Sequence, residues 1–238
     1  MRTAIPALTI AVGLLISATA DTAPRTTSGE AARAPIASPA LPPIIISVYV
    51  APHIPASTVA RLLAETDDIW RPNGFTFVWQ RGPAEVAPYG RTGDANRYQP
   101  STLRVTIDNQ RGGPTAEAQT PLGWITFDRP DEPDQQIHVS YANAETLLAA
   151  SSIVVGNVGM MPQAQREMYV ARALGRALAH ELGHYLLASK AHTPHGLMQT
   201  ARSAVELFGR ERKPFLLDAL QQQVAVSRFT QTAMVSRR

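Results

Sequence analysis

The segment from His180 to His192 holds the residues of this chain whose types and spacing suit metal chemistry. His180 and His184 are four residues apart, so on a helix they lie on one face, one turn above the other. Two imidazoles at that spacing can bind one zinc ion, and Glu181 beside them can activate a water molecule on the metal. The segment predicts either a metal-dependent hydrolytic site or a helix that carries two histidines without a metal.

A third ligand is available further along the chain. A catalytic zinc site needs three protein ligands and one open position for water. His192 follows His184 by eight residues and offers a third nitrogen from the chain that leaves the helix. Beyond it, a tight turn at Gly196-Leu197-Met198 could bring a methionine beneath the metal.

The composition limits the other classes of function. The chain has 238 residues, of which 45% are hydrophobic, which is enough for one sizeable core. The net charge is +3, but the basic residues are scattered and are not interleaved with aromatic residues, so nucleic acid is not an expected partner. Cysteine is absent, which excludes disulfides, thiolate ligands and a cysteine nucleophile, and leaves histidines and carboxylates for a metal.

The first residues have the pattern of an export signal. Arg2 supplies a positive start, residues 7–16 form an apolar core, and Ala18-Thr19-Ala20 is a small-residue cleavage site. The apolar run is shorter than the ~20 residues that a membrane-spanning helix needs, although an uncleaved anchor stays open as an alternative. We expect a signal peptide over residues 1–20, a secreted or periplasmic mature protein without a stable membrane span, and a disordered Ala/Pro-rich linker over residues 21–43.

Strands precede helices in the remainder of the chain, residues 44–238. Segments rich in β-branched or alternating apolar residues predict strands at 44–50, 75–79, 103–107, 122–127 and 137–141. Helices are expected over about 57–70 with a cap at Ser57 or Thr58, from a cap at Asn143 through Leu148, from Pro162 through Tyr185, over 203–208 with Thr200 as cap, and over 214–229. Residues 81–101, 109–121 and 151–161 are expected to be loops, and residues 128–134 a turn.

This order of elements predicts an α+β domain with helices packed under a small, mixed, twisted sheet of about five strands. The first strand, the helix after it and the second strand form a right-handed crossover, so these strands should be parallel or nearly neighbouring. The long helix buries one stripe, from Met168 through Leu174 and Leu178 to Tyr185, and His180 and His184 lie to one side of it with Ala173 and Ala177 beneath.

With these residues in view, the chain resembles the zincin metallopeptidases, and specifically a metzincin-like arrangement. The resemblance rests on His180-Glu181-x-x-His184, a downstream histidine and a turn that contains methionine. It implies that His180, His184 and His192 bind Zn²⁺, that Glu181 is the general base, and that Met198 lies in the turn beneath the zinc. It also implies a zincin-like catalytic domain with a peptide or protein as substrate.

The sequence departs from that family at three positions. Leu187 and Lys190 stand where metzincins have the helix-breaking glycine and the third histidine. The helix is therefore expected to continue further and to turn around Ser189 and Lys190, without the tolerance of glycine for positive φ. His195 and Glu206 stay open as alternative third ligands. Thr200 replaces a tyrosine of some metzincins, so no side chain is assigned to stabilise an oxyanion.

The expected function is an exported zinc-dependent peptidase in which Glu181 accepts a proton from the attacking water. An extended substrate could pair with the strand at 122–127 if that strand is an exposed edge. The alternative from another class is an exported binding or scaffold protein with a structural or vestigial zinc site. A third alternative is that the histidines bind no metal.

Overall fold

The computed structural model describes residues 41–82, 103–111 and 121–235. The predicted signal peptide, most of the predicted linker and most of the two longest predicted loops lie outside these ranges. The elements are, in chain order, β1 (Ile44–Val50), α1 (Ala56–Trp70), η1 (Arg71–Asn73), β2 (Phe77–Arg81), β3 (Arg104–Asp108), β4 (Gly123–Arg129), β5 (Glu132–Ser140), α2 (Tyr141–Ala150), α3 (Ser152–Val155), η3 (Val158–Met160), α4 (Gln163–Leu187), α5 (Ala204–Phe208), η4 (Lys213–Phe215) and α6 (Ala219–Val235).

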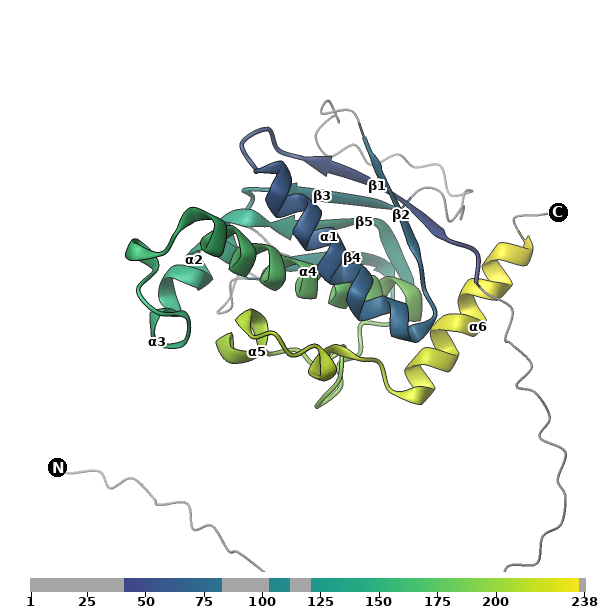
Figure 1. Ribbon diagram of the computed structural model, residues 1–238. Helices are drawn as coiled ribbons and strands as arrows, with labels where there is room; N and C mark the ends of the chain where they lie inside the picture. Colours follow the sequence, from purple (N-terminus) through teal and green to yellow (C-terminus); the bar gives the residue numbers. More distant parts are fainter. Residues whose placement is uncertain (1–40, 83–102, 112–120, 236–238) are drawn as a thin grey trace, which may run out of the picture. The chain divides into compact units, whose positions relative to one another are not determined.

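The strands form one sheet in the order β2-β1-β3-β5-β4 (Figure 1). β1 is parallel to both β2 and β3, and β3 is parallel to β5, whereas β4 runs antiparallel to β5. The predicted α+β class with a mixed sheet of five strands is confirmed. The β1-α1-β2 unit joins adjacent parallel strands, as the sequence pattern predicted.

β4 is an edge strand of this sheet, because among the described residues it pairs only with β5. Its register shifts between Ile125 and Phe127 and again between Phe127 and Arg129, which marks bulges in the β4–β5 hairpin. β5 begins at Glu132, so the predicted turn at 128–134 was too long. The acidic residues of this segment have a low strand propensity, so the sequence did not indicate the hairpin. Strand pairing, rather than intrinsic propensity, extends both strands.

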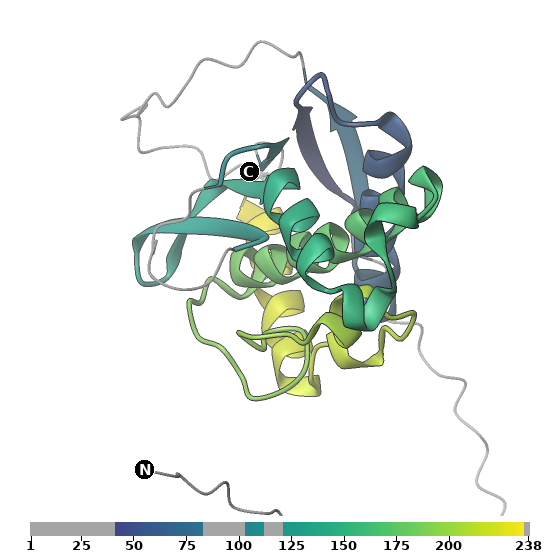
Figure 2. The ribbon, with the colours of Figure 1, turned by 90° about the vertical axis from the view of Figure 1, so that its left-hand side faces the viewer.

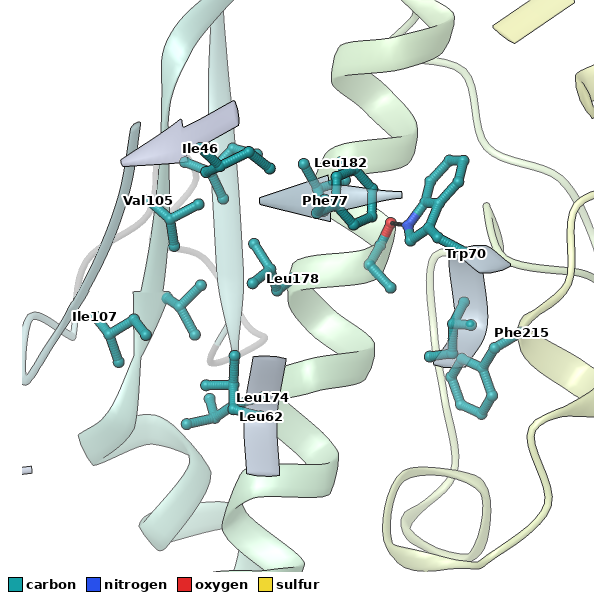
Figure 3. Packing of buried hydrophobic residues seen from close by; sticks show 14 of the residues in the cluster. Ile46, Leu62, Trp70, Phe77, Val105, Ile107, Leu174, Leu178, Leu182 and Phe215 are labelled. Atoms are coloured by element: carbon teal, nitrogen blue, oxygen red, sulfur yellow. Dashed lines mark hydrogen bonds between the residues drawn. The ribbon is translucent and has the colours of Figure 1, made fainter. Parts of the chain in front are cut away.

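One face of the sheet is buried beneath α1 and α4, which lie on the same side (Figures 1 and 2). Along β1, Ile44, Ile46 and Val48 are buried while the intervening residues are only partly so, as expected when alternate side chains point to opposite faces. Figure 3 shows Ile46 and Val105 on the sheet side of the core and Leu178 on α4 facing them. Each such side chain contributes about 1.5–3 kcal/mol by leaving water.

α1 fixes the position of α4 through direct contacts with its backbone. The indole Nε1 of Trp70 donates to the carbonyl of Ala179 at 3.1 Å, a bond visible in Figure 3. The hydroxyl of Thr66 donates to the carbonyl of Gly175 at 3.0 Å. A β-carbon at Gly175 would lie 2.7 Å from the Leu62 carbonyl oxygen, so a glycine is required at this crossing. The helix that carries the histidines is thus held firmly against the sheet.

The predicted ends of several helices were wrong. α1 begins at Ala56 after Pro55, without a side-chain cap. α2 begins at Tyr141, and its cap is Ser140, whose hydroxyl accepts from the amide of Asn143 at 3.2 Å. The residue that caps a helix depends on tertiary packing as much as on residue type, because several neighbouring polar residues can accept the hydrogen bonds of the first helical amides.

The segments on either side of α4 also differ from expectation. Residues 151–161, expected as a loop, contain α3 and η3, and Pro162 precedes α4 instead of starting it. After α4, the cap of α5 is Ser203 rather than Thr200, and α6 starts at Ala219 rather than Pro214 because η4 intervenes. Among the helices in the described ranges, none is both long enough and apolar enough to cross a bilayer.

Candidate metal centre

His180 and His184 stand on the last two turns of α4, a helix of 25 residues. The helix ends at Leu187, and Ala188 adopts the left-handed conformation with φ 44° and ψ 51°. The amide of Ala188 then bonds back to the carbonyls of His184 and Tyr185. The turn was expected around Ser189 and Lys190, but it lies at Ala188. This alanine adopts the positive φ that glycine would adopt without strain.

Both histidine rings are fixed through Nδ1. His180 Nδ1 lies 2.8 Å from the carbonyl oxygen of Leu197, and His184 Nδ1 lies 2.6 Å from that of Ser189. A carbonyl oxygen can only accept, so each Nδ1 carries the proton. In the neutral ring Nε2 is then left with a free lone pair, which is the form in which histidine binds a metal.

The two Nε2 atoms face each other at 3.0 Å, and their rings meet edge to face. Two unprotonated nitrogens at this distance repel each other unless they share a cation. His192 lies beside them: its ring is stacked on that of His180, with centroids 5.3 Å apart, and edge-on to that of His184 at 4.9 Å. One nitrogen from each of the three histidines falls within 4.8 Å of the other two.

The structure does not bring the two alternative ligands into this cluster. Among the described residues, the group of side chains close enough to share a metal contains only histidines 180, 184 and 192. Glu206 instead completes a capping box with Ser203 and pairs with Arg202 at 3.1 Å. His195 contributes its backbone carbonyl to the hydroxyl of Thr193 at 2.8 Å.

The turn at Gly196-Leu197-Met198 packs directly beneath the two histidines. Gly196 has φ 77°, a conformation that favours glycine. Leu197 supplies the carbonyl that holds His180, and Met198 is fully buried with its sulfur against the backbone of Gly183. The pattern at these positions suggested a tight turn with a buried methionine, and the structure has one.

Glu181 is buried on the same helix, beneath β4. Burial raises the pKa of its carboxyl to about 8, opposed by a hydrogen bond from the backbone amide of Ile125. The strand comes this close because residue 123 is a glycine: a β-carbon there would lie 3.2 Å from Cγ of Glu181 and 3.7 Å from Cβ of Ala177. The expectation that Gly123 marks a close backbone approach agrees with this geometry.

The imidazoles are kept neutral by their surroundings. Burial is the main cause that lowers the pKa of His180 to about 3, and the neighbouring His184 lowers it further. Burial also lowers the pKa of His184 and, although its ring is more exposed, that of His192. Neutral rings at physiological pH present lone pairs rather than protons to an incoming ion.

Several residues of the site were not found by sequence reasoning. Phe127 of β4 lies edge-on to His184 at 6.4 Å between ring centroids, and Lys190 places its ammonium 5.2 Å from the same phenyl ring. The alternation of β4 puts Phe127 on the same face as Gly123 and Ile125, and this periodicity could have indicated it. The carbonyls of Leu197 and Ser189 could not have been indicated, because every residue has one.

The chain was also compared with known proteins. No protein-family model matches the sequence, and no curated protein matches it. The chain is similar to the crystal structure of archaemetzincin from Methanopyrus kandleri, with 14% sequence identity and a TM-score of 0.45 over 79% of this chain and 96% of that chain. A similarity of this degree carries no argument, so the description of the fold rests on the geometry above.

Proposed function

We propose that this protein is a zinc-dependent peptidase whose metal is bound by His180, His184 and His192. The single observation that carries the proposal is the pair of Nε2 atoms facing each other at 3.0 Å while both Nδ1 atoms are committed to carbonyls. Helical histidines placed by packing alone have no reason to turn two lone pairs toward one point. A shared cation gives that reason.

The donor set fits zinc. Nitrogens bound at about 2.0–2.1 Å to a tetrahedral zinc lie about 3.3 Å apart, close to the 3.0 Å between the Nε2 atoms of His180 and His184. The third nitrogen, from the more exposed His192, lies within 4.8 Å of the other two and would complete the donor set. Three neutral imidazoles leave a fourth position for water, as a catalytic zinc site requires.

Glu181 is the proposed general base. Zinc held by the histidines would polarise the scissile carbonyl and lower the pKa of water. The carboxylate of Glu181 accepts a proton from the attacking water and passes it to the leaving amine nitrogen. Burial raises the pKa of this carboxyl to about 8, so its carboxylate is a stronger base toward the water proton than an exposed glutamate, and a bound dication would favour the ionised form that the first step needs.

The edge of β4 that faces away from β5 is the proposed binding surface for an extended substrate. The carbonyl of Leu122 accepts from the amide of Ser140 at 2.9 Å, so in the alternating antiparallel pattern Gly123 and Ile125 direct their backbone groups away from β5. A peptide that pairs there by strand addition would pass Glu181, whose carboxylate already bonds to the Ile125 amide. This supports a peptide, rather than a compact small molecule, as substrate.

The test combines metal content with cleavage. We expect the purified protein to hold about one zinc per chain and to degrade a fluorescently labelled unfolded protein, with activity lost to a chelator and restored by zinc. Glu181→Gln should keep the zinc and lose about two to four orders of magnitude in rate. His184→Ala should lose the zinc.

The same measurements separate the alternatives. A zinc-containing protein that cleaves nothing, and whose zinc is retained in Glu181→Gln, would favour the binding or scaffold protein with a structural site. Absence of stoichiometric zinc from the wild type would contradict both. Full activity in Glu181→Gln would show that Glu181 is not the general base.

We also propose that the protein is exported to the periplasm or the medium. The support is the signal-like sequence of residues 1–20, which lies outside the described residues. Expression of the full chain followed by N-terminal sequencing should give a mature start near Asp21. Recovery of the intact N-terminus from the cytoplasm would contradict export.

A further inference from the structure

The acceptor that orients His180 does not belong to its own helix. Leu197 lies on the turn at residues 196–198, and its carbonyl reaches the imidazole across the space between that turn and α4. The turn has no regular secondary structure, so its position depends on tethers. The amide of Leu197 donates to the carbonyl of Leu216 at 2.9 Å, and the amide of Thr193 donates to the carbonyl of Met198 at 3.0 Å.

Arg202 provides a further tether, and it is nearly buried, with 8% of its side chain exposed. Its guanidinium donates to the carbonyl of Gly196, the residue before Leu197, and to the carbonyl of Pro214 at 3.1 Å. It thereby joins the turn to the segment that precedes α6. Its charge is balanced by Glu206 at 3.1 Å, which explains how an arginine can be buried here.

The side chain of Arg202 is anchored in the core through Phe215. The guanidinium of Arg202 lies 4.4 Å from the centroid of this ring, and that of Arg176 on α4 lies 4.5 Å from it. Arg176 is in turn bonded to the buried carboxylate of Glu65 on α1 at 2.9 Å. Contacts of charged groups with aromatic faces strengthen when both are withdrawn from water. Arg202 is thus connected to the same α1–α4 framework that fixes the histidines.

We infer that Arg202 is a positioning residue for the candidate metal centre: by holding the Gly196 carbonyl, it sets the Leu197 carbonyl that orients the ring of His180. The choice of arginine follows from geometry. A planar guanidinium can bond two carbonyls and one carboxylate at once and still stack on a ring, whereas the ammonium of lysine is a point charge. Arg202 acts on the orientation of His180 through the turn, and its charge also lowers the pKa of that ring through space.

Metal-free protein gives a direct test that does not depend on zinc. Long-range proton–nitrogen NMR reports which nitrogen of His180 carries the proton, and the wild type should show the Nδ1–H form. Arg202→Met should shift His180 toward a mixture of forms. Arg212→Met is the matched control, since Arg212 bonds to Glu65 and Asp68 on α1 instead of to the turn. It should leave the His180 signals unchanged.

Zinc affinity gives the second measurement, which rests on the proposed function. Loss of a partner that orients a ligand costs about tenfold to a hundredfold in metal affinity, so Arg202→Met should weaken zinc binding about tenfold in a chelator competition, and Arg212→Met should not. The visible spectrum of the cobalt-substituted protein should change in the first variant alone. Arg202→Lys, which keeps the charge, serves if the methionine variant does not fold, and it should be weakened too.

The outcomes distinguish the two proposals. Unchanged His180 signals in both Arg202 variants, or equal changes in Arg212→Met, would overturn the role of Arg202. A wild type with the Nδ1–H form that binds no zinc would instead contradict the proposed peptidase and leave the role of Arg202 in orienting His180 supported by the NMR result.

Discussion

Gly183 and Met198 are packed so closely that a side chain at position 183 would overlap Met198. A β-carbon on Gly183 would overlap the sulfur of Met198, and it would lie 3.7 Å from a methyl carbon of Leu197. Gly183 stands between the two histidines on α4, so the turn packs against bare helix backbone directly beneath the candidate ligands. The glycine inside the motif is therefore required by packing, although glycine weakens a helix by about 1 kcal/mol relative to alanine.

Gly183→Ala should destabilise the protein despite the better helix propensity of alanine. Overpacking of a filled core costs about 1–3 kcal/mol, which exceeds the gain in propensity. The free energy of unfolding from urea titration measures the effect. Met198→Ala in the same chain should make room for the new methyl group, so the double variant should lose less than the sum of the single losses. Simple additivity would show that the two residues do not compete.

Ala188→Gly should stabilise the protein by less than about 1 kcal/mol, because the relieved backbone strain is partly offset by loss of the buried Ala188 methyl group. Ala188 has φ 44°, and the left-handed region costs an L-residue roughly 1–2 kcal/mol, part of which is offset by the greater flexibility of glycine in the unfolded chain. Ala60→Gly, on the exposed face of α1, should have the opposite sign. Thermal or urea unfolding of both variants decides it, and a loss in Ala188→Gly would mean that the helix does not end as described.

Gly123→Ala should lower the rate of peptide cleavage while leaving zinc content unchanged. The new methyl group would press on the Glu181 side chain from 3.2 Å and on the His138 carbonyl from 3.1 Å. Displacement of a catalytic group by as little as 1 Å can cost about a hundredfold, and we expect a loss of roughly tenfold to a hundredfold. Thr126→Ala, on the same strand but on its other face, is the control. Loss of zinc in Gly123→Ala would place the damage at the histidines instead.

His180 should make the metal-free protein less stable as the pH falls below about 6.5. The raised pKa of Glu181, about 8 against an ordinary 4.5, acts in the opposite direction above pH 4.5, so the His180 contribution is measured as the difference between wild type and a His180 variant. The pKa of His180 is about 3 in the folded state and ordinarily 6.5, so between these values the unfolded chain binds a proton that the folded chain does not. This contribution is present above pH 6.5 and is lost progressively toward pH 3. His180→Gln should flatten the dependence of unfolding free energy on pH over that window. A slope unchanged by the substitution would contradict a buried, neutral His180.

The local part of the site was predictable from sequence. The four-residue spacing of His180 and His184, the neighbouring Glu181 and the apolar stripe of α4 depend only on helix geometry, which a short segment determines by itself. The parallel β1-α1-β2 unit was predictable for a similar reason, because the handedness of the crossover leaves few alternatives. The absence of cysteine likewise limited the ligand types before any coordinates were known.

Tertiary structure alone decided which residues meet. The chain turns at Ala188, earlier than the expected turn around Ser189 and Lys190, and His192 lies beside the pair, whereas Glu206 is committed to the cap of α5. The Leu197 carbonyl reaches His180 only because Arg202 and the segment before α6 hold a turn that has no structure of its own. Spacing along a helix is fixed by backbone geometry, whereas contacts between distant segments depend on packing and on how intervening loops close. Contacts between distant segments leave no periodic signal in a single sequence.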